Sequence, residues 1–324
     1  MRRQESREND PSSRIVHRKV EQIVIDSRYD IYSVAFLTDG KHFVSGDREG
    51  KIRRWRTEDG KEVGTAMDAG SDVLNIAVSR DGKWIVGGTK SGFVTVWNAE
   101  SHSKVARFKA HNDYVRAVDV SPDATKIVTG SDDKTACVWS LSTRLLGPLQ
   151  HDNWVAAAKF SPDGHLVATA TYNRRSVRVY DSQSGSLLVE FPVSVNSWFN
   201  QSLAWASDSK QLFVSSLDGC VRVGVSAKIT LSEWQIRSGS QNARSITITS
   251  DGAFIATSAG SSVSFWDTTN QEQIGVVIEY THGILSMAMS SNYDLVTSGD
   301  KRITLRALCG TLPSHYLGNV SVPV

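Results

Sequence analysis

The sequence is poor in residues that would cross-link a fold or anchor it in a membrane. It has three cysteines, Cys137, Cys220 and Cys309, which are odd in number, far apart and without CxxC spacing. This argues against a disulfide framework or a zinc site and favours a reducing compartment. No apolar run approaches the roughly 18 residues of a membrane helix, and the charged N-terminus lacks the apolar stretch of a signal peptide. We therefore expect an intracellular protein of the cytoplasm or nucleus, without a membrane partner.

Motifs for catalysis or cofactor binding are also missing. There is no HExxH, EF-hand loop, GxSxG or paired Cys/His spacing among the eight histidines. The stretch GDREGK at 46–51 is one residue short of a phosphate-binding loop and lacks the following Ser or Thr, so we interpret it as a turn between strands. The sequence predicts no cofactor and no metal.

The charge is nearly balanced and the composition is that of a globular protein. Hydrophobic residues make up 40% of the 324 residues and charged residues 22%. The net charge is +2, of which residues 1–19 carry +3, so the remainder carries −1. No overall field attracts nucleic acid or a membrane surface.

A short segment rich in β-forming residues recurs along the whole chain, and its last residue is aromatic in most copies. The segments are GKIRRW, GFVTVW, KTACVW, SVRVY, CVRVG, SVSFW and RITLR. Their last residues are Trp55, Trp97, Trp139, Tyr180, Gly224, Trp266 and Arg306, at successive steps of 42, 42, 41, 44, 42 and 40 residues. The sequence therefore holds seven copies of a repeat of about 42 residues.

Each copy also contains an alternating strand, a turn with Asp or Asn, and a second strand. Examples are VSPDA followed by TKIVTG, and FSPDG followed by HLVATA. Four short strands fit in each repeat, and no stretch has helical periodicity. This pattern predicts an all-β fold, a single seven-bladed β-propeller of four-stranded antiparallel blades.

Residues 19–309 resemble the WD40-repeat β-propeller family. A literal Trp-Asp pair occurs at Trp266-Asp267, with Tyr180-Asp181 as a near form, and the Gly-His half survives as Ala110-His111 and Gln150-His151. The resemblance rests on the seven copies in register and not on the individual dipeptides. It implies a ring-shaped scaffold that binds other proteins.

The ends of the predicted propeller follow from the need to pair every outer strand. KVEQIVI at 19–25 aligns with KVARFKA and EQIGVVI, so we expect it to complete the blade that ends at Arg306 and to close the ring. Residues 1–18 are then a disordered basic tail and residues 310–324 a C-terminal tail.

The third repeat contains the residues of a WD40-type hydrogen-bonded chain, His111, Thr129, Asp133 and Trp139. A buried indole N–H needs an acceptor. A hydroxyl can accept its hydrogen bond, and an imidazole and a carboxylate can continue the hydrogen-bonded chain. The alternative is catalytic, with Asp132 and Asp133 as an acid–base pair or Thr129, His111 and Asp133 as a triad. We favour the structural interpretation, because a hydroxyl bonded to Trp has no side left for a substrate.

Alignment of the repeats also predicts which side chains gather on one face of the ring, called the top face. That set contains aromatic and arginine side chains, the residue types of interface hot spots. It comprises Tyr32, Tyr114, Arg116, Trp154, Phe199 and Arg244. The alternative for Trp154 and Phe199 is an inward position in the propeller core.

The leading functional hypothesis is a non-catalytic scaffold or adaptor that binds a protein or peptide on this top face, as a monomer or as a subunit of a larger complex. One alternative is an enzyme that uses the propeller channel as an acid-catalysed hydrolase. The aligned positions offer it only Asp30 and Asp72. A second alternative is a nucleic-acid-associated adaptor. The tail argues against it, because a net charge of +3 with acids interspersed offers little binding to phosphates.

Overall fold

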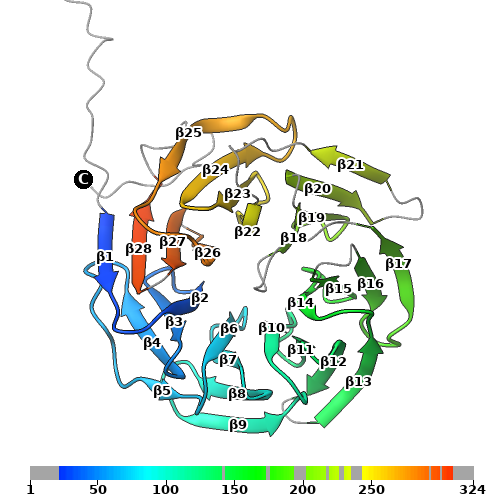
Figure 1. Cartoon of the computed structure of the whole chain (residues 1–324), viewed down its shortest axis with the longest axis horizontal. Coiled ribbons are helices and arrows are strands. Elements are labelled where there is room, and N and C mark those ends of the chain that lie inside the picture. The colour runs from blue at the N-terminus through cyan, green and yellow to red at the C-terminus, as the bar shows by residue number, and fades with distance from the viewer. Residues whose placement is uncertain are drawn as a thin grey trace, which may run out of the picture.

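The chain forms a ring of β-sheets around a central channel (Figure 1). The computed structural model describes residues 22–140, 143–172, 176–192, 202–216, 219–225, 230–234, 243–291, 293–299 and 301–308. These residues contain seven four-stranded antiparallel sheets and no helix, hence no helix able to cross a membrane. The predicted seven-bladed β-propeller is confirmed. The predicted tails, 1–18 and 310–324, lie outside the described residues.

Each blade runs from an inner first strand to an outer fourth strand. The first strands surround the channel (Figure 1): β2 (Ile31–Phe36), β6 (Val73–Val78), β10 (Val115–Val120), β14 (Val155–Phe160), β18 (Leu203–Trp205), β22 (Ala243–Ile248) and β26 (Ser286–Met289). The second strands are β3 (His42–Asp47), β7 (Trp84–Thr89), β11 (Ile127–Ser131), β15 (Leu166–Thr171), β19 (Gln211–Ser216), β23 (Phe254–Ala259) and β27 (Asp294–Gly299). The third strands are β4 (Lys51–Arg56), β8 (Phe93–Asn98), β12 (Thr135–Ser140), β16 (Val177–Asp181), β20 (Gly219–Gly224), β24 (Ser262–Asp267) and β28 (Arg302–Ala307). The fourth strands are β5 (Met67–Asp68), β9 (Lys104–Lys109), β13 (Thr143–Gln150), β17 (Leu187–Phe191), β21 (Thr230–Trp234), β25 (Gln273–Glu279) and, in the last blade, β1 (Gln22–Asp26).

The ring is closed by β1, which supplies the outer strand of the seventh blade. It pairs antiparallel with β28, with Val24 opposite Thr304, and Arg302 Nε donates to Asp26 at 2.9 Å. Ile23 and Ile25 pack against the core between the first and last blades. The predicted closure by the N-terminal strand is confirmed. The described part of this strand is Gln22–Asp26, and residues 19–21 of the predicted stretch 19–25 lie outside the described residues.

Aspartates shape the turns between the first and second strands. In six blades the turn aspartate accepts a hydrogen bond from the backbone N–H two residues further on, as in an Asx turn. The six are Asp39, Asp81, Asp123, Asp163, Asp208 and Asp251. The predicted turn at 46–51 likewise connects β3 to β4, with Asp47 accepting from the N–H groups of Glu49 and Lys51.

Neighbouring blades are also joined by hydrogen bonds near the channel. Ser33 Oγ accepts from the Ile76 N–H at 3.0 Å, and Asn75 Oδ1 accepts from the Val118 N–H at 2.9 Å. Ser286 links the last blade to the first in the same way, through the Val34 N–H at 3.0 Å. These acceptors satisfy buried backbone donors that no sheet ladder reaches.

Apolar side chains fill the space between adjacent blades. Where two blades lie closest together, the second strand has a glycine. A Cβ at Gly88 would lie 2.7 Å from Val115 of the next blade, and one at Gly130 would lie 2.7 Å from Val155. At these two positions the second strand lies so close to the following blade that a side chain would force a shift.

We expect removal of residues 1–26 to destabilise the propeller and removal of residues 1–18 to change it little. The longer truncation exposes the edge of β28 and the apolar surface that Ile23 and Ile25 cover, at a cost of roughly 2–4 kcal/mol. Thermal melts of the two truncated proteins measure the difference. Equal melting temperatures would contradict closure of the ring by β1.

Candidate functional site

The two faces of the ring differ in which turns they carry. On the top face lie the beginnings of the first strands and the turns between second and third strands. On the opposite bottom face lie the ends of the first strands and the aspartate turns. Side chains in equivalent positions of successive blades are therefore neighbours around the ring.

In the third blade, four residues form one continuous hydrogen-bonded chain below the top face. Trp139 Nε1 donates to Thr129 Oγ1 at 2.9 Å, and Thr129 Oγ1 lies 2.7 Å from His111 Nε2. His111 Nδ1 lies 3.0 Å from an oxygen of Asp133. Since Nδ1 faces a carboxylate, it carries the ring proton, and Nε2 accepts from the threonine hydroxyl.

The burial and hydrogen bonds of these four residues favour a structural role over a catalytic triad. Burial by itself would raise the pKa of Asp133, but hydrogen bonds from His111 and Thr135 outweigh it and hold the pKa well below its ordinary value. Thr129 is fully buried, with its hydroxyl between an indole and an imidazole. A hydroxyl in that position offers no approach to a substrate.

Other blades retain parts of the chain. Trp55 Nε1 donates to Ser45 Oγ at 2.8 Å, and Trp266 Nε1 donates to Thr257 Oγ1 at 3.0 Å. In the fourth blade, His151 Nε2 lies 2.9 Å from Thr169 Oγ1, and its Nδ1 lies 2.9 Å from the Leu149 carbonyl oxygen. In each of these blades a hydroxyl at the position of Thr129 takes part in the hydrogen bonds, whereas a carboxylate does not.

The first blade replaces the histidine and aspartate by a different ion pair, which the sequence alignment does not predict. Asp47 is buried and pairs with Arg53, and Arg53 also lies 3.9 Å from Glu49 and 3.6 Å from Glu62. Its signal in the sequence is an arginine in the third strand where the third blade has Cys137.

Three of the residues predicted for the top face come together on the third and fourth blades. Arg116 forms a two-pronged ion pair with Asp132, with Nε–Oδ1 at 2.9 Å and Nη2–Oδ2 at 2.8 Å. Its guanidinium carbon lies 5.2 Å from the ring centre of Tyr114 and 6.0 Å from that of Trp154. The arginine is therefore fixed between two aromatic rings.

Trp154 lies at the surface and is not part of the propeller core. It is half-buried and stacks on Tyr172, with ring centres 5.6 Å apart and planes at 18°. Trp154, Tyr172, Tyr114 and Arg116 thus form one aromatic surface, which we call the aromatic arc. Aligning the positions at the first strands does not identify Tyr172, and the sequence suggested Asp132 only as the partner of Asp133 in an acid–base pair.

Tyr172 and Asp132 occupy one repeated position at the end of the second strand. Its backbone N–H donates to the residue that precedes the first strand, at 3.0, 3.0, 3.0 and 2.9 Å in the first four blades. The position holds Arg48, Lys90, Asp132 and Tyr172. The same period of about 42 residues that reveals the blades would have located it.

On the first two blades this position pairs with acids. Arg48 lies 3.6 Å from Asp30, and Lys90 lies 3.9 Å from Asp72. Burial is the main cause of a raised pKa for Tyr32, whose neighbours Asp30 and Asp72 act in the same direction while Arg48 opposes them. The two aspartates that an enzyme would need are thus already partnered by bases.

The remaining predicted contacts are not described. Phe199 lies outside the described residues, as does the side chain of Arg244, whose backbone is in β22. Within the described part of the chain, no three His, Cys, Asp or Glu side chains gather as a metal site. Cys137 and Cys220 are buried free thiols, and burial raises the pKa of Cys220 to about 12.

We expect Asp133→Ala and Trp139→Ala to lower stability. The first leaves the donors of His111 and Thr135 without their acceptor, at about 1–3 kcal/mol, and the second opens a cavity at about 3–5 kcal/mol. Urea unfolding measures both, with Glu58→Ala, at an exposed acid, as the control. Unfolding curves of the two variants that match the parent would refute a structural role.

His151 should make the fourth blade sensitive to mild acid. Burial lowers its pKa to about 4, from 6.5 in an unfolded chain, so below pH 6.5 the unfolded chain binds a proton that the folded chain does not. The contribution of neutral His151 is complete above that pH and falls by about 1.4 kcal/mol per pH unit toward pH 4. Comparing urea unfolding at about pH 7.5 and about pH 5, we expect His151→Asn to lose roughly 2 kcal/mol less than the parent. An equal loss in both proteins would show that another group is responsible.

The chain is similar to WD40 proteins in its repeat sequence and in its fold. The family model for the WD domain, G-beta repeat, matches residues 21–56, 60–98, 102–140 and 144–181. Autophagy-related protein 18 of Caenorhabditis elegans is 38% identical over 74 residues, which are 22% of this chain and 18% of that relative. The match therefore spans about a fifth of the relative's length.

Solved structures resemble this protein over most of its length. The crystal structure of RRP9 WD40 repeats superposes with a TM-score of 0.75 at 19% identity, covering 88% of this chain and 97% of that one. The structure of U3-55K gives a TM-score of 0.76 at 19% identity, covering 89% and 98%. At this identity the likeness concerns the fold alone. Four repeats within residues 21–181 match the WD40 family model, and three further blades of the same four-stranded design complete a WD40-type β-propeller.

Proposed function

We propose that this protein is a non-catalytic scaffold or adaptor that binds a protein or peptide through the aromatic arc on its top face. WD40 propellers are generally non-enzymatic scaffolds, and the fold is consistent with that role. The fold by itself does not identify a site, so the proposal depends on the side chains. Residues 19–309 would act as the binding unit.

The observation that supports the proposal most is the fixed position of Arg116. Its ion pair with Asp132 uses one edge of the guanidinium, and Tyr114 and Trp154 lie beside it. A partner therefore meets aromatic side chains beside a guanidinium that has already lost its rotational freedom. Binding to such a surface costs less side-chain entropy, which is typical of interface hot spots.

Asp132 also determines how the arc must be tested. The carboxylate side chain is only 6% exposed, so Arg116→Ala alone would leave a buried charge without its partner and lower stability. The double variant Arg116→Ala/Asp132→Ala removes both charges together. Loss of a partner can then be separated from loss of folding.

We expect Trp154→Ala, Tyr114→Ala and the double variant to lose partner recovery while melting close to the parent. A hot-spot truncation loses on the order of 2 kcal/mol of binding free energy, roughly thirtyfold in affinity. Affinity purification with quantitative mass spectrometry identifies proteins that the parent recovers and the variants do not, and melting temperatures are recorded for the same proteins.

Phe93→Ala and Arg107→Ala are matched controls on the second blade. There Arg107 lies 4.2 Å from the ring centre of Phe93, an aromatic–arginine pair outside the arc. These two variants should keep the partner. Unchanged recovery in all three arc variants, with folding intact, would show that the binding surface lies elsewhere.

A further inference from the structure

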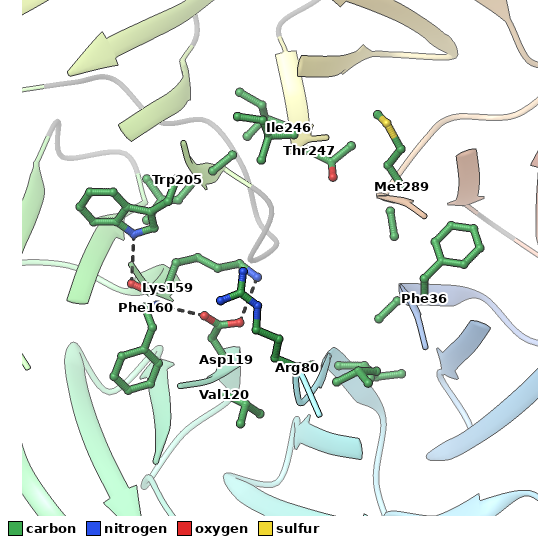
Figure 2. A pocket seen from close by; sticks show the side chains of 18 of the residues that line it. Phe36, Arg80, Asp119, Val120, Lys159, Phe160, Trp205, Ile246, Thr247 and Met289 are labelled. Atoms are coloured by element: carbon green, nitrogen blue, oxygen red, sulfur yellow. Dashed lines mark hydrogen bonds and ion pairs between the residues drawn. The ribbon is translucent and has the colours of Figure 1, made fainter. Parts of the chain in front are cut away.

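A cavity lies at the opposite end of the channel from the aromatic arc. It has a volume of about 460 Å³ and is lined by the ends of the first strands of all seven blades (Figure 2). This volume is within the range of roughly 300–1,000 Å³ typical of ligand pockets. We call this cavity the bottom mouth.

One side of the bottom mouth is cationic. Arg80 of the second blade and Lys159 of the fourth point into the channel beside Asp119 of the third (Figure 2). Among the described lining residues these are the only charged ones, so the lining carries a net +1. The charges occupy three adjacent blades and not the whole ring.

Both carboxylate oxygens of Asp119 have partners on this side of the cavity. One carboxylate oxygen accepts from the Phe160 N–H at 2.9 Å, and the other lies 3.3 Å from Lys159 Nζ. Arg80 is exposed, and its Nη1 donates to the Pro162 carbonyl oxygen at 3.4 Å. That long bond occupies one of five guanidinium N–H groups and leaves donors directed at the cavity.

The other side of the bottom mouth is apolar. Phe36, Ile248 and Met289 end the first strands of the first, sixth and seventh blades, and Trp205 ends that of the fifth. Figure 2 places Phe36 and Met289 across the channel from Lys159. A ligand in this cavity thus meets cations on one side and aromatic or aliphatic surface on the other.

Two aspartates at the rim, Asp81 and Asp163, form no ion pair with Arg80 or Lys159. Asp81 accepts from Ser79 Oγ at 2.6 Å and from the Lys83 N–H at 3.1 Å, and Asp163 accepts from Ser161 Oγ at 2.5 Å and from the His165 N–H at 3.0 Å. These carboxylates are bonded within their own turns. They would instead repel a long polyanion that lay across the rim.

We propose that the bottom mouth binds a short acidic segment of a partner protein, in which a carboxylate lies next to a bulky apolar side chain. The carboxylate pairs with Arg80 and Lys159, and the apolar side chain packs against Phe36 and Met289. Charge complementarity selects the acid, and the apolar side excludes water from the ion pair. Nucleic acid is disfavoured, because it needs a track of several cations.

Peptide selection tests this proposal without knowledge of the partner. Random 12-residue peptides displayed on phage are selected on the full chain, and enriched peptides are synthesised with a fluorescent label for anisotropy measurements. We expect enriched sequences to place Asp or Glu beside Leu, Met or Phe. Binding should weaken at least about tenfold when the acid is replaced by its amide, and weaken further with added salt.

Protein variants locate the binding site. Arg80→Glu should lose at least about tenfold in affinity, whereas Lys83→Glu, an equal charge change at an exposed lysine outside the cavity, should not. Lys159→Met should also weaken binding, and melting temperatures check that it folds. Because Arg80 is exposed, Arg80→Glu decides the outcome if Lys159→Met is unstable.

Several results would overturn the proposal. They are failure to enrich acidic peptides, equal binding by the Arg80→Glu and Lys83→Glu variants, and binding of a labelled single-stranded oligonucleotide that depends on Arg80. The Arg116→Ala/Asp132→Ala variant should bind the selected peptides like the parent. This separates the bottom mouth from the aromatic arc, so either proposal can fail alone.

Discussion

Closure of the ring is the constraint on which the rest of the structure depends. Each blade buries its faces against its two neighbours, so an open array would leave apolar faces and strand edges exposed at both ends. The pairing of β1 with β28 removes those ends, and Ile23 and Ile25 add apolar contact between the first and last blades. With the ring closed, every first strand begins on one face and ends on the other. Both candidate binding surfaces are consequences of that arrangement.

Inside the ring, buried polar groups are satisfied locally, and blades can therefore differ in how they do it. Thr129 connects Trp139 to His111 and Asp133 in the third blade, whereas the first blade uses Asp47 with Arg53. Between blades, a serine or asparagine accepts the same backbone N–H. Side chains on the top face and in the channel that make none of these bonds can vary to suit a partner.

Both surfaces place an arginine or lysine with the help of an aspartate from a neighbouring position. Asp132 fixes Arg116 between two rings on the top face, and Asp119 holds Lys159 beside the channel. Aromatic rings lie beside Arg116, and apolar side chains lie across the channel from Lys159. Limited solvent near the charge strengthens its interaction with an incoming group, and a fixed position lowers the entropy lost on binding.

The sequence by itself determined the repeat, the number of blades, the closing strand and the His111–Thr129–Asp133–Trp139 set, because these depend on local alternation and on a period that every copy repeats. It also indicated Tyr114, Arg116 and Trp154. Only the tertiary structure brought Asp132 to Arg116, Tyr172 to Trp154, and Arg80 and Lys159 to one cavity. These partners come from different strands or blades, so the contacts within each pair depend on how strands and blades pack together. Their meeting is decided by the packing of whole blades around the axis, which no local pattern encodes.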